Sequence, residues 1–195
     1  MKKITASFFA LLLVASAGIL YLKTIHNNIS SNVIRMHIVA NSNSISDQSV
    51  KLKIRDKILE NYSFAAKGIR EEKEYIETNI EKINKDVNNW LKEENKSYGA
   101  KAHLSKSYFP TKKYGGLSLP KGEYTAFKIV LGEGKGENWW CVMFPPLCFA
   151  DSSVGTIDEK SDEYLKANLS GDEYKLVTSD GTKIKFRLLE FINSF

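Results

Sequence analysis

The stretch from Gly132 to Cys148, GEGKGENWWCVMFPPLC, constrains the fold of this chain most strongly. Alternating glycines open it, and because glycine adopts backbone angles that other residues avoid, we expect a flexible loop there. The apolar run of residues 139–144 follows at once and predicts a strand. Pro145 and Pro146 must end that strand, because proline has no N–H to donate to a ladder. The sequence therefore predicts a loop, a strand and a sharp turn in succession.

The N-terminus carries an export signal. Residues 4–22 contain no charge, follow Lys2 and Lys3, and approach the roughly 20 residues that cross a bilayer. The Ala15-Ser16-Ala17 sequence favours a cleaved signal peptide, whereas the apolar run that continues to Leu22 favours an uncleaved anchor. Because positive charge stays inside, either interpretation places the rest outside the cytoplasm. We expect residues 1–23 to be a signal peptide or signal anchor, 24–32 a tether, and 33–195 an exported globular α+β domain.

Cys141 and Cys148 are the two cysteines of the chain. In an exported domain a disulfide is the favoured interpretation, and it requires the two Cα atoms to approach within about 7 Å. A catalytic thiol at Cys141, with His37 or His103 as its partner, lacks a surrounding hydrolase signature. The spacing of the two cysteines does not match that of a zinc knuckle. Retained thiols are the alternative to the disulfide.

Trp139 and Trp140 are adjacent, so in a strand their side chains must point to opposite faces of the sheet. One can fill the core, and the other would then be exposed or covered by a neighbouring loop. An exposed aromatic side chain beside a glycine loop is a candidate binding anchor. Burial of both side chains is the alternative, and the sequence does not decide between them.

The charge balance excludes some classes of function. The chain has 28 basic and 23 acidic residues, and without Lys2, Lys3 and Lys23 the count is 25 against 23, which implies no nucleic-acid partner. The segment of residues 132–137, GEGKGE, matches neither a P-loop nor a dinucleotide-binding turn. We therefore expect no cofactor, no metal and no small-molecule substrate. A composition of 43% hydrophobic and 26% charged residues is that of one globular domain.

The order of the predicted elements indicates the fold class. Apolar spacing predicts strands at 33–40, 100–109, 123–131 and 139–144, helices at 46–62 and 69–96, and a short helix at 162–169. Residues 183–195 could form a strand or a helix. The long helix has one apolar stripe, which we expect to pack on the sheet rather than in a coiled coil. We predict an α+β fold, with a mixed or mostly antiparallel sheet and two N-terminal helices on one face.

Two segments carry a family resemblance: Ile34–Leu59, with IRMHIVANSNSISDQSVKLKIRDKIL, and Leu119–Asp151, with LPKGEYTAFKIVLGEGKGENWWCVMFPPLCFAD. Both resemble the stage II sporulation protein R family of endospore-forming Firmicutes, although Asn43 replaces the aspartate of the usual ANSDS. The resemblance implies export from the forespore into the space between forespore and mother cell. There such proteins activate a membrane-embedded aspartic protease of the mother cell, stage II sporulation protein GA, which cleaves the early mother-cell pro-sigma factor. The resemblance implies a signalling protein rather than an enzyme.

The resemblance also selects candidate site residues. The first motif comprises Ala40, Asn41, Ser42, Asp47, Gln48, Lys51, Arg55 and Asp56. The second comprises Gly132, Glu133, Gly134, Gly136, Asn138, Trp139, Trp140, Cys141, Pro145, Pro146 and Cys148, and Lys135 between them is a further partner-binding candidate. We expect the second to face the protease, because aromatic anchors carry more interface energy than exposed charges.

Other interpretations of these residues stay open. In the first motif, Asp47, Lys51 and Arg55 are four residues apart and could instead form an ion-pair ladder along the helix. An envelope hydrolase that uses Cys141, or the carboxylates of Glu133 and Glu137, is the rival function. A structural scaffold that binds a partner through the long helix is a third.

Overall fold

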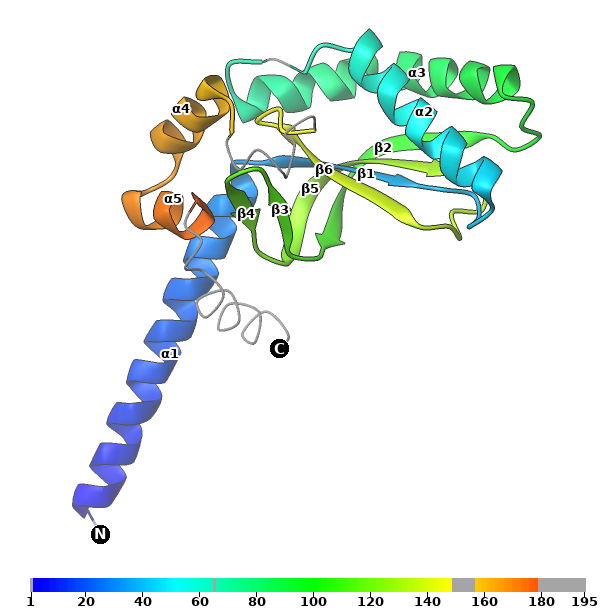
Figure 1. The fold of residues 1–195 in the computed structure, drawn as a ribbon. Helices are drawn as coiled ribbons and strands as arrows, with labels where there is room; N and C mark the ends of the chain where they lie inside the picture. Colours follow the sequence, from blue (N-terminus) through cyan, green and yellow to red (C-terminus); the bar gives the residue numbers. More distant parts are fainter. Residues whose placement is uncertain (1, 65, 149–156, 179–195) are drawn as a thin grey trace.

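A four-stranded sheet forms the centre of the computed structural model, which describes residues 2–64, 66–148 and 157–178 (Figure 1). The strands are β1 (Ile34–Val39), β2 (Ala100–Phe109), β5 (Gly122–Leu131) and β6 (Asn138–Phe144), and β3 (Lys112–Tyr114) pairs with β4 (Leu117–Leu119) in a separate hairpin. The helices are α1 (Lys2–Ser31), α2 (Ile45–Asn61), α3 (Ile69–Glu93), α4 (Glu159–Asn168) and α5 (Gly171–Thr178). The predicted α+β class is confirmed.

The strand order is β2-β5-β1-β6, and β1 is parallel to β5 but antiparallel to β6. The sheet is therefore mixed, as predicted. All six residues of β1 are buried, because both of its neighbours pair with it and both faces of the sheet are covered. Since β5 and β6 are consecutive in the sequence but flank β1, the chain between them has to pass over the end of β1.

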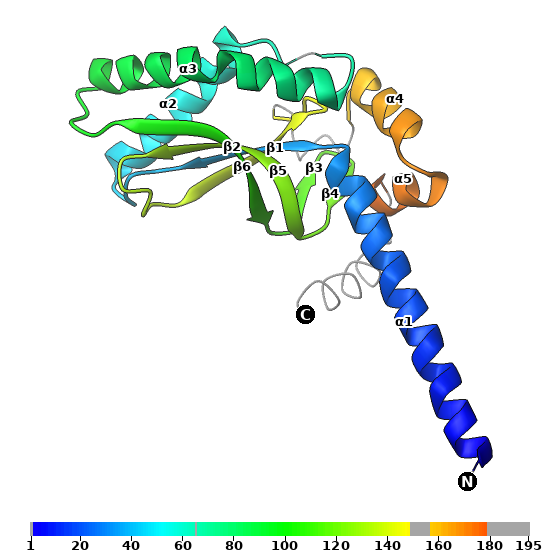
Figure 2. The same ribbon diagram turned by 180° about the vertical axis from the view of Figure 1, so that it is seen from behind.

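Helices α2 and α3 cover one face of the sheet, as Figures 1 and 2 both show. The apolar stripe of α3 is buried at Ile76, Ile83, Val87 and Leu91, so it packs within the domain as predicted. On the same helix, Asn84 and Asn88 bind the outer edge of β2. Each amide donates to a carbonyl oxygen of β2 and accepts from the N–H of the same residue, Ala102 and Ala100 respectively. These bonds pair backbone groups on the outer edge of β2, which would otherwise be open to the addition of another strand.

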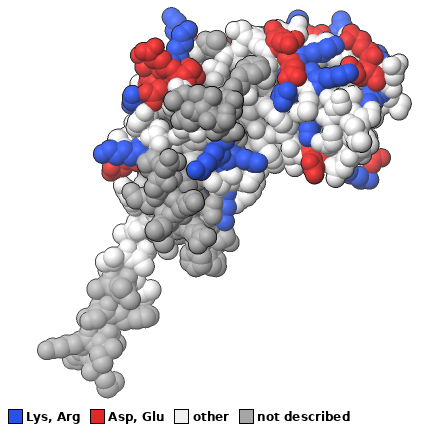
Figure 3. All heavy atoms as spheres, viewed as in Figure 1, with Lys and Arg blue, Asp and Glu red and all other residues white. Residues whose placement is uncertain are grey.

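The surface of the helical layer carries charges of both signs. On the face shown in Figure 3, lysine and arginine side chains are interspersed with aspartate and glutamate rather than separated from them. Two ion pairs join α2 to the C-terminal end of α3: Lys57 with Glu93, and Lys53 with Glu94, the residue that follows the helix, both at 2.6 Å. Such exposed pairs contribute little to stability, typically about 0.2–1 kcal/mol each. The two helices are therefore held mainly by their buried stripes.

The opposite face of the sheet is covered by the β3–β4 hairpin and by the C-terminal part of α1. Arg35 of β1 is fully buried there. Its guanidinium donates to the Tyr114 hydroxyl at 2.7 Å and lies 4.1 Å from the ring centroid of Phe109. Aromatic faces attract cations, so these rings partly compensate for the lost hydration of Arg35. The sequence did not predict this hairpin, because its three-residue strands lie in a segment rich in Pro and Gly.

The segment 24–32, expected as a polar tether, is helical through Ser31. Ile25 and Ile29 are buried in the core, and the ring of His26 packs edge-on against Tyr124 with centroids 5.6 Å apart. The helix therefore continues into the domain instead of ending before it (Figure 2). Among the residues that the structure describes, no helix combines the length and apolar character needed to cross a membrane.

The C-terminal region contains two helices after β6. Helix α4 begins three residues before the predicted 162–169, with Asp158 as its N-cap. Helix α5 was not predicted, and its first residue is Gly171, which weakened the helical signal. Residues 183–195, whose secondary structure stayed open in the sequence, lie outside the described residues.

Candidate partner-binding surface

The two sequence motifs meet at one end of the sheet. The loop between β5 and β6 crosses the end of β1 and rests on the turn that leads into α2. Backbone N–H groups of Lys135 and Gly136 donate to the carbonyl oxygens of Asn41 and Ala40 at 3.1 and 2.9 Å. We call residues 41–45 and 132–139 together the crossing corner. The loop is thus anchored along its length and is not the free connection that its glycines predicted.

Two asparagine side chains add to this anchoring. Asn41 Oδ1 accepts from the N–H of Glu133 at 2.9 Å, and Asn43 Oδ1 accepts from the N–H of Glu137 at 2.7 Å. The amide oxygen of Asn43 therefore performs an acceptor role that an aspartate oxygen could also perform. The replacement of the usual aspartate is compatible with this geometry.

Glycine is required in the loop for two different reasons. Gly132 and Gly134 have φ of 54° and 62°, the left-handed region that favours glycine. At Gly136 the requirement is space, because a Cβ there would overlap the carbonyl oxygen of Ser42. The alternating glycines therefore serve the crossing over β1 and not the binding of a phosphate.

Asp47 is the polar centre beneath this surface. Its carboxylate accepts from Asn41 Nδ2, Ser42 Oγ, Lys96 Nζ and Tyr98 OH, at 2.7 to 2.8 Å. These hydrogen bonds, led by the one from Lys96, hold the pKa of Asp47 well below its usual value. Asp47 therefore fixes the turn after β1 and has no free oxygen for a partner.

The ion-pair ladder that the spacing on α2 left open is not formed among the described residues. Lys51 donates to the side chain of Gln48 at 2.6 Å and to the carbonyl oxygen of Glu137 at 3.0 Å. Arg55 pairs with its neighbour Asp56 at 2.6 Å. The Gln48 side chain and the Glu137 carbonyl of the crossing loop thus bind the lysine that the helix spacing would have paired with Asp47.

Trp139 and Trp140 are both half-buried and lie on opposite faces of β6. The Arg55 guanidinium lies 5.0 Å from the ring centroid of Trp139, on the side of α2. Trp140 stacks on His37 at 3.8 Å and contacts Phe109 edge-on. Trp139 is therefore the tryptophan that belongs to the crossing corner, whereas Trp140 helps to cover the opposite face of the sheet.

His37 is buried beside Trp140, and its Nε2 lies 2.6 Å from Asn138 Oδ1. Burial lowers the pKa of His37 to about 4, against a smaller opposing effect from the Asn138 hydrogen bond. His37 cannot serve as a base for Cys141. In the register of β1 with β6, Cys141 lies opposite Met36 and Trp140 opposite His37, so the sulfur and the imidazole lie on opposite faces.

Cys141 and Cys148 form a disulfide, with Cα atoms 5.0 Å apart. The bond closes the turn that contains Pro145 and Pro146, and the N–H of Leu147 donates to the Val142 carbonyl oxygen within it. In this state Cys141 has no thiol to act as a nucleophile. The two prolines lie at the other end of β6 from the crossing loop, so the second motif is divided between two places.

Ile45 is a surface residue that the sequence analysis did not select. It is the first residue of α2 and is 92% exposed, directly after the turn that holds the crossing loop. Nearby, Glu133 and Lys135 form an exposed ion pair at 2.8 Å. The phase of the buried stripe contained the signal, because the stripe of Val50, Ile54 and Ile58 continues back to the buried Asp47 and leaves position 45 off it.

No group of three or more His, Cys, Asp or Glu side chains within residues 12–64, 66–148 and 157–178 is arranged to hold a metal ion. The crossing corner instead offers an apolar side chain, a half-buried tryptophan, and charges of both signs. This composition is typical of a protein-binding surface.

Comparison with known proteins assigns the chain to a family. Residues 30–154 match the family model of stage II sporulation protein R. The chain is also 35% identical over 183 residues to stage II sporulation protein R of Bacillus subtilis (strain 168), an alignment that covers 85% of this chain and 82% of that protein. It belongs to this family. No solved structure matches the chain.

Membership in the stage II sporulation protein R family assigns the chain a role in sporulation. The residues matched by the family model extend from the end of α1 past β6 and contain both halves of the crossing corner. Helices α4 and α5 lie beyond the matched residues.

Proposed function

We propose that this chain is an exported signalling protein that activates a membrane-embedded aspartic protease, stage II sporulation protein GA, and thereby causes cleavage of the early mother-cell pro-sigma factor. The observation that carries the proposal is membership in the stage II sporulation protein R family. The uncharged residues 4–22 support export across the forespore membrane into the space between forespore and mother cell. The domain is membrane-anchored or released, according to whether this segment is retained.

The proposed contact with the protease is the crossing corner. Ile45 supplies an exposed apolar side chain, Trp139 a half-buried aromatic ring, and Glu133 and Lys135 a pair of charges at the rim. Interfaces commonly combine an aromatic or apolar anchor with a polar rim. Because the loop is anchored to the β1–α2 turn, these groups are presented in a fixed arrangement, which reduces the entropy lost on binding.

Activation by binding requires a difference in affinity. A ligand shifts a protein toward its active state only when it binds that state more tightly than the inactive one. The exported domain would therefore recognise an arrangement of the protease's outer region that occurs in the active enzyme. The signal is then a protein contact, and it needs no reaction catalysed by this chain.

The test is cleavage of the pro-sigma factor in a non-sporulating host that makes the protease and its substrate, with and without this protein. We expect cleavage only when the protein is present. Ile45→Asp and Trp139→Ala are each expected to reduce cleavage at least tenfold, because each removes a proposed anchor. Trp90→Ala, which removes a half-buried tryptophan from α3, is the matched control and should leave cleavage near the wild-type level.

Absence of cleavage, with all three proteins exported and folded, would contradict the proposal. An envelope enzyme would then become the leading hypothesis. Normal cleavage with both corner variants would keep the signalling function but would remove the crossing corner as its contact surface.

A further inference from the structure

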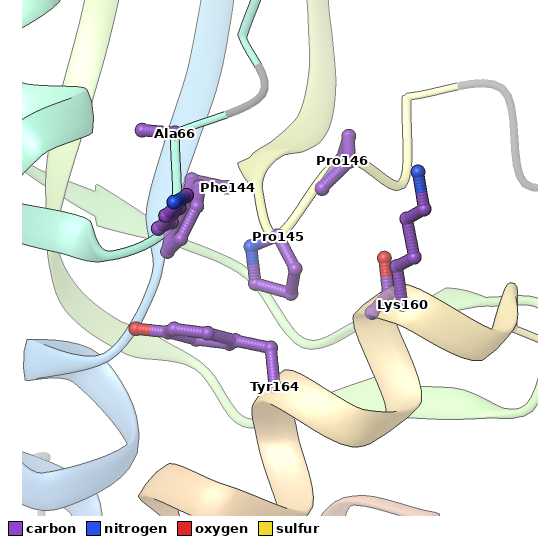
Figure 4. Close-up of a pocket in the computed structure, with 8 residues that line it drawn as sticks. Ala66, Phe144, Pro145, Pro146, Lys160 and Tyr164 are labelled. Carbon is purple, nitrogen blue, oxygen red and sulfur yellow. The ribbon is translucent and has the colours of Figure 1, made fainter.

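A pocket of about 310 Å³ lies beside the Pro145-Pro146 turn, away from the crossing corner. Three segments line it: Ala66 and Lys67 from the connection between α2 and α3, Phe144 to Pro146 at the end of β6, and Lys160, Ser161 and Tyr164 from α4 (Figure 4). Its α4 wall lies beyond residue 154, where the match to the family model ends.

The walls of the pocket are mainly apolar and aromatic. Phe144 and Pro145 are buried, and the ring of Tyr164 packs edge-on against Phe144 with centroids 4.7 Å apart. Ligand pockets usually measure about 300–1,000 Å³, so this one is at the small end of the range. Its size suits one or two side chains of a peptide rather than a large cofactor.

The polar groups of the pocket favour a negative charge. The N-terminus of α4 contributes Lys160 and Ser161, and helix N-termini attract anions. Lys67 and Lys160 are exposed at the pocket, and neither ammonium has an ion-pair partner among the described residues. The carboxylate of Glu71 accepts from the backbone N–H of Lys67 rather than pairing with its ammonium.

Ser161 supplies an independent indication of a ligand. Its side chain is 1% exposed, yet its Oγ has no hydrogen-bond partner. A buried hydroxyl without a partner costs free energy, and native structures seldom leave one unpaired without a reason. A ligand in the pocket could provide the missing partner. Because the acidic residues Asp158 and Glu159 stand at the same helix end, a single carboxylate suits this site better than a phosphate dianion.

We propose that this pocket binds a short acidic segment of a partner protein. An aromatic or branched aliphatic side chain of that segment inserts against Phe144 and Pro145. A neighbouring Asp or Glu carboxylate is held by the two lysines and by Ser161 Oγ. The inference rests on the proposed function in one respect: the partner is the outer region of the protease, so the pocket is a second contact besides the crossing corner.

The experiment uses the full-length chain in the cleavage assay described above, and measures in parallel how much of it co-purifies with the detergent-solubilised protease. We expect Ala66→Trp, which fills the pocket, and the double variant Lys67→Glu/Lys160→Glu each to reduce both readouts at least tenfold. Lys85→Glu/Lys92→Glu on α3 has the same change in charge at exposed lysines and should reduce neither.

Ser161→Ala separates a binding role from a structural one. It removes a hydroxyl that has no partner within the protein, so the thermal midpoint should stay unchanged or rise. Co-purification should nevertheless fall severalfold, because the ligand carboxylate loses a donor. A lowered midpoint with unchanged co-purification would show that the hydroxyl serves the fold and would overturn the proposal.

The remaining outcomes distinguish this inference from the proposed function. Failure of the wild-type chain to cause cleavage would contradict the function itself. Normal cleavage by the wild type and by all pocket variants would overturn the pocket inference alone. Reduced cleavage with unchanged co-purification would assign the pocket to another ligand, such as an anionic lipid or a second copy of this chain, and would equally overturn the proposal.

Discussion

Gly136 shows how a single residue sets the geometry of the crossing corner. A methyl group there would meet the Ser42 carbonyl oxygen, which belongs to the backbone and cannot rotate away. We expect Gly136→Ala to lower the free energy of unfolding by about 1–3 kcal/mol, the usual cost of overpacking. Gly68→Ala is the control, because a Cβ at Gly68 meets nothing within 4 Å. Urea titrations that gave equal losses for both variants would show that the loop moves aside freely.

We expect the stability of the domain to depend on pH because of the buried His37. Its pKa is lowered to about 4 in the folded protein, whereas an unfolded histidine titrates near 6.5. Between these values the unfolded state binds more protons than the folded state, so stability falls as the pH drops from 6.5 to 4. The contribution of His37 to this loss should be about 2–3 kcal/mol, at 1.36 kcal/mol for each pKa unit. Unfolding curves in urea at pH 4.5, 5.5 and 7 would measure it.

The variant His37→Phe keeps a ring against Trp140 and removes the titration. Its stability should vary less between pH 4.5 and 7 than that of the wild type. Burial also lowers the pKa of His26 and His103, so part of the dependence of stability on pH should persist in this variant. His103→Gln, at a less buried position on β2, should keep most of the wild-type slope. An unchanged slope in His37→Phe would assign the effect to other groups.

At the scale of elements, regular apolar spacing made most of the sheet and the long helices predictable. Strands β1, β2, β5 and β6 and helices α2 and α3 all lie where alternation or four-residue spacing indicated. The β3–β4 hairpin and α5 have too few residues to establish a period. The end of α1 looked like a tether because polar residues separate Ile25 and Ile29, although their four-residue spacing is helical.

The disulfide belongs to the turn that ends β6. In the chain-entropy view, a bond that closes so short a loop stabilises the fold by about 2–2.5 kcal/mol. We expect the double variant Cys141→Ser/Cys148→Ser to lose about this much free energy of unfolding in urea titrations. It should still cause cleavage of the pro-sigma factor at temperatures where it is folded. Complete loss of activity in the folded double variant would contradict this and would favour a chemical role for Cys141. Trp90→Ala is again the control, because it changes the packing of α3 and leaves the disulfide intact.

At the scale of the whole molecule, the sequence indicated both motifs but not that they lie in contact at one end of the sheet. The meeting follows from the strand order, in which β5 and β6 flank β1, and no local pattern in the chain encodes that order. The acceptor role of Asn43 and the anchoring of Lys51 by Glu137 were unpredictable for the same reason. The pocket beside Pro146 likewise joins three segments that are distant in sequence.

The burial of Ile25 and Ile29 predicts where the folded domain begins. A chain that starts at Thr24 keeps both side chains, whereas a chain that starts at Asn32 loses them together with the bond from Asn28 to Glu173. The shorter chain should be about 3–6 kcal/mol less stable in urea, because each of the two buried isoleucines contributes about 1.5–3 kcal/mol. Equal stabilities would show that the end of α1 is not part of the core.

The crossing corner has a consequence for timing. Asn41 and Glu133, which meet there, are 92 positions apart in the sequence. The two halves cannot meet until β6 has been synthesised and has paired with β1. If the chain is exported as proposed, a molecule still passing through the export channel displays no complete surface. If the receiving cell responds to this corner, it responds to finished molecules that have been delivered and folded, and not to the start of their production.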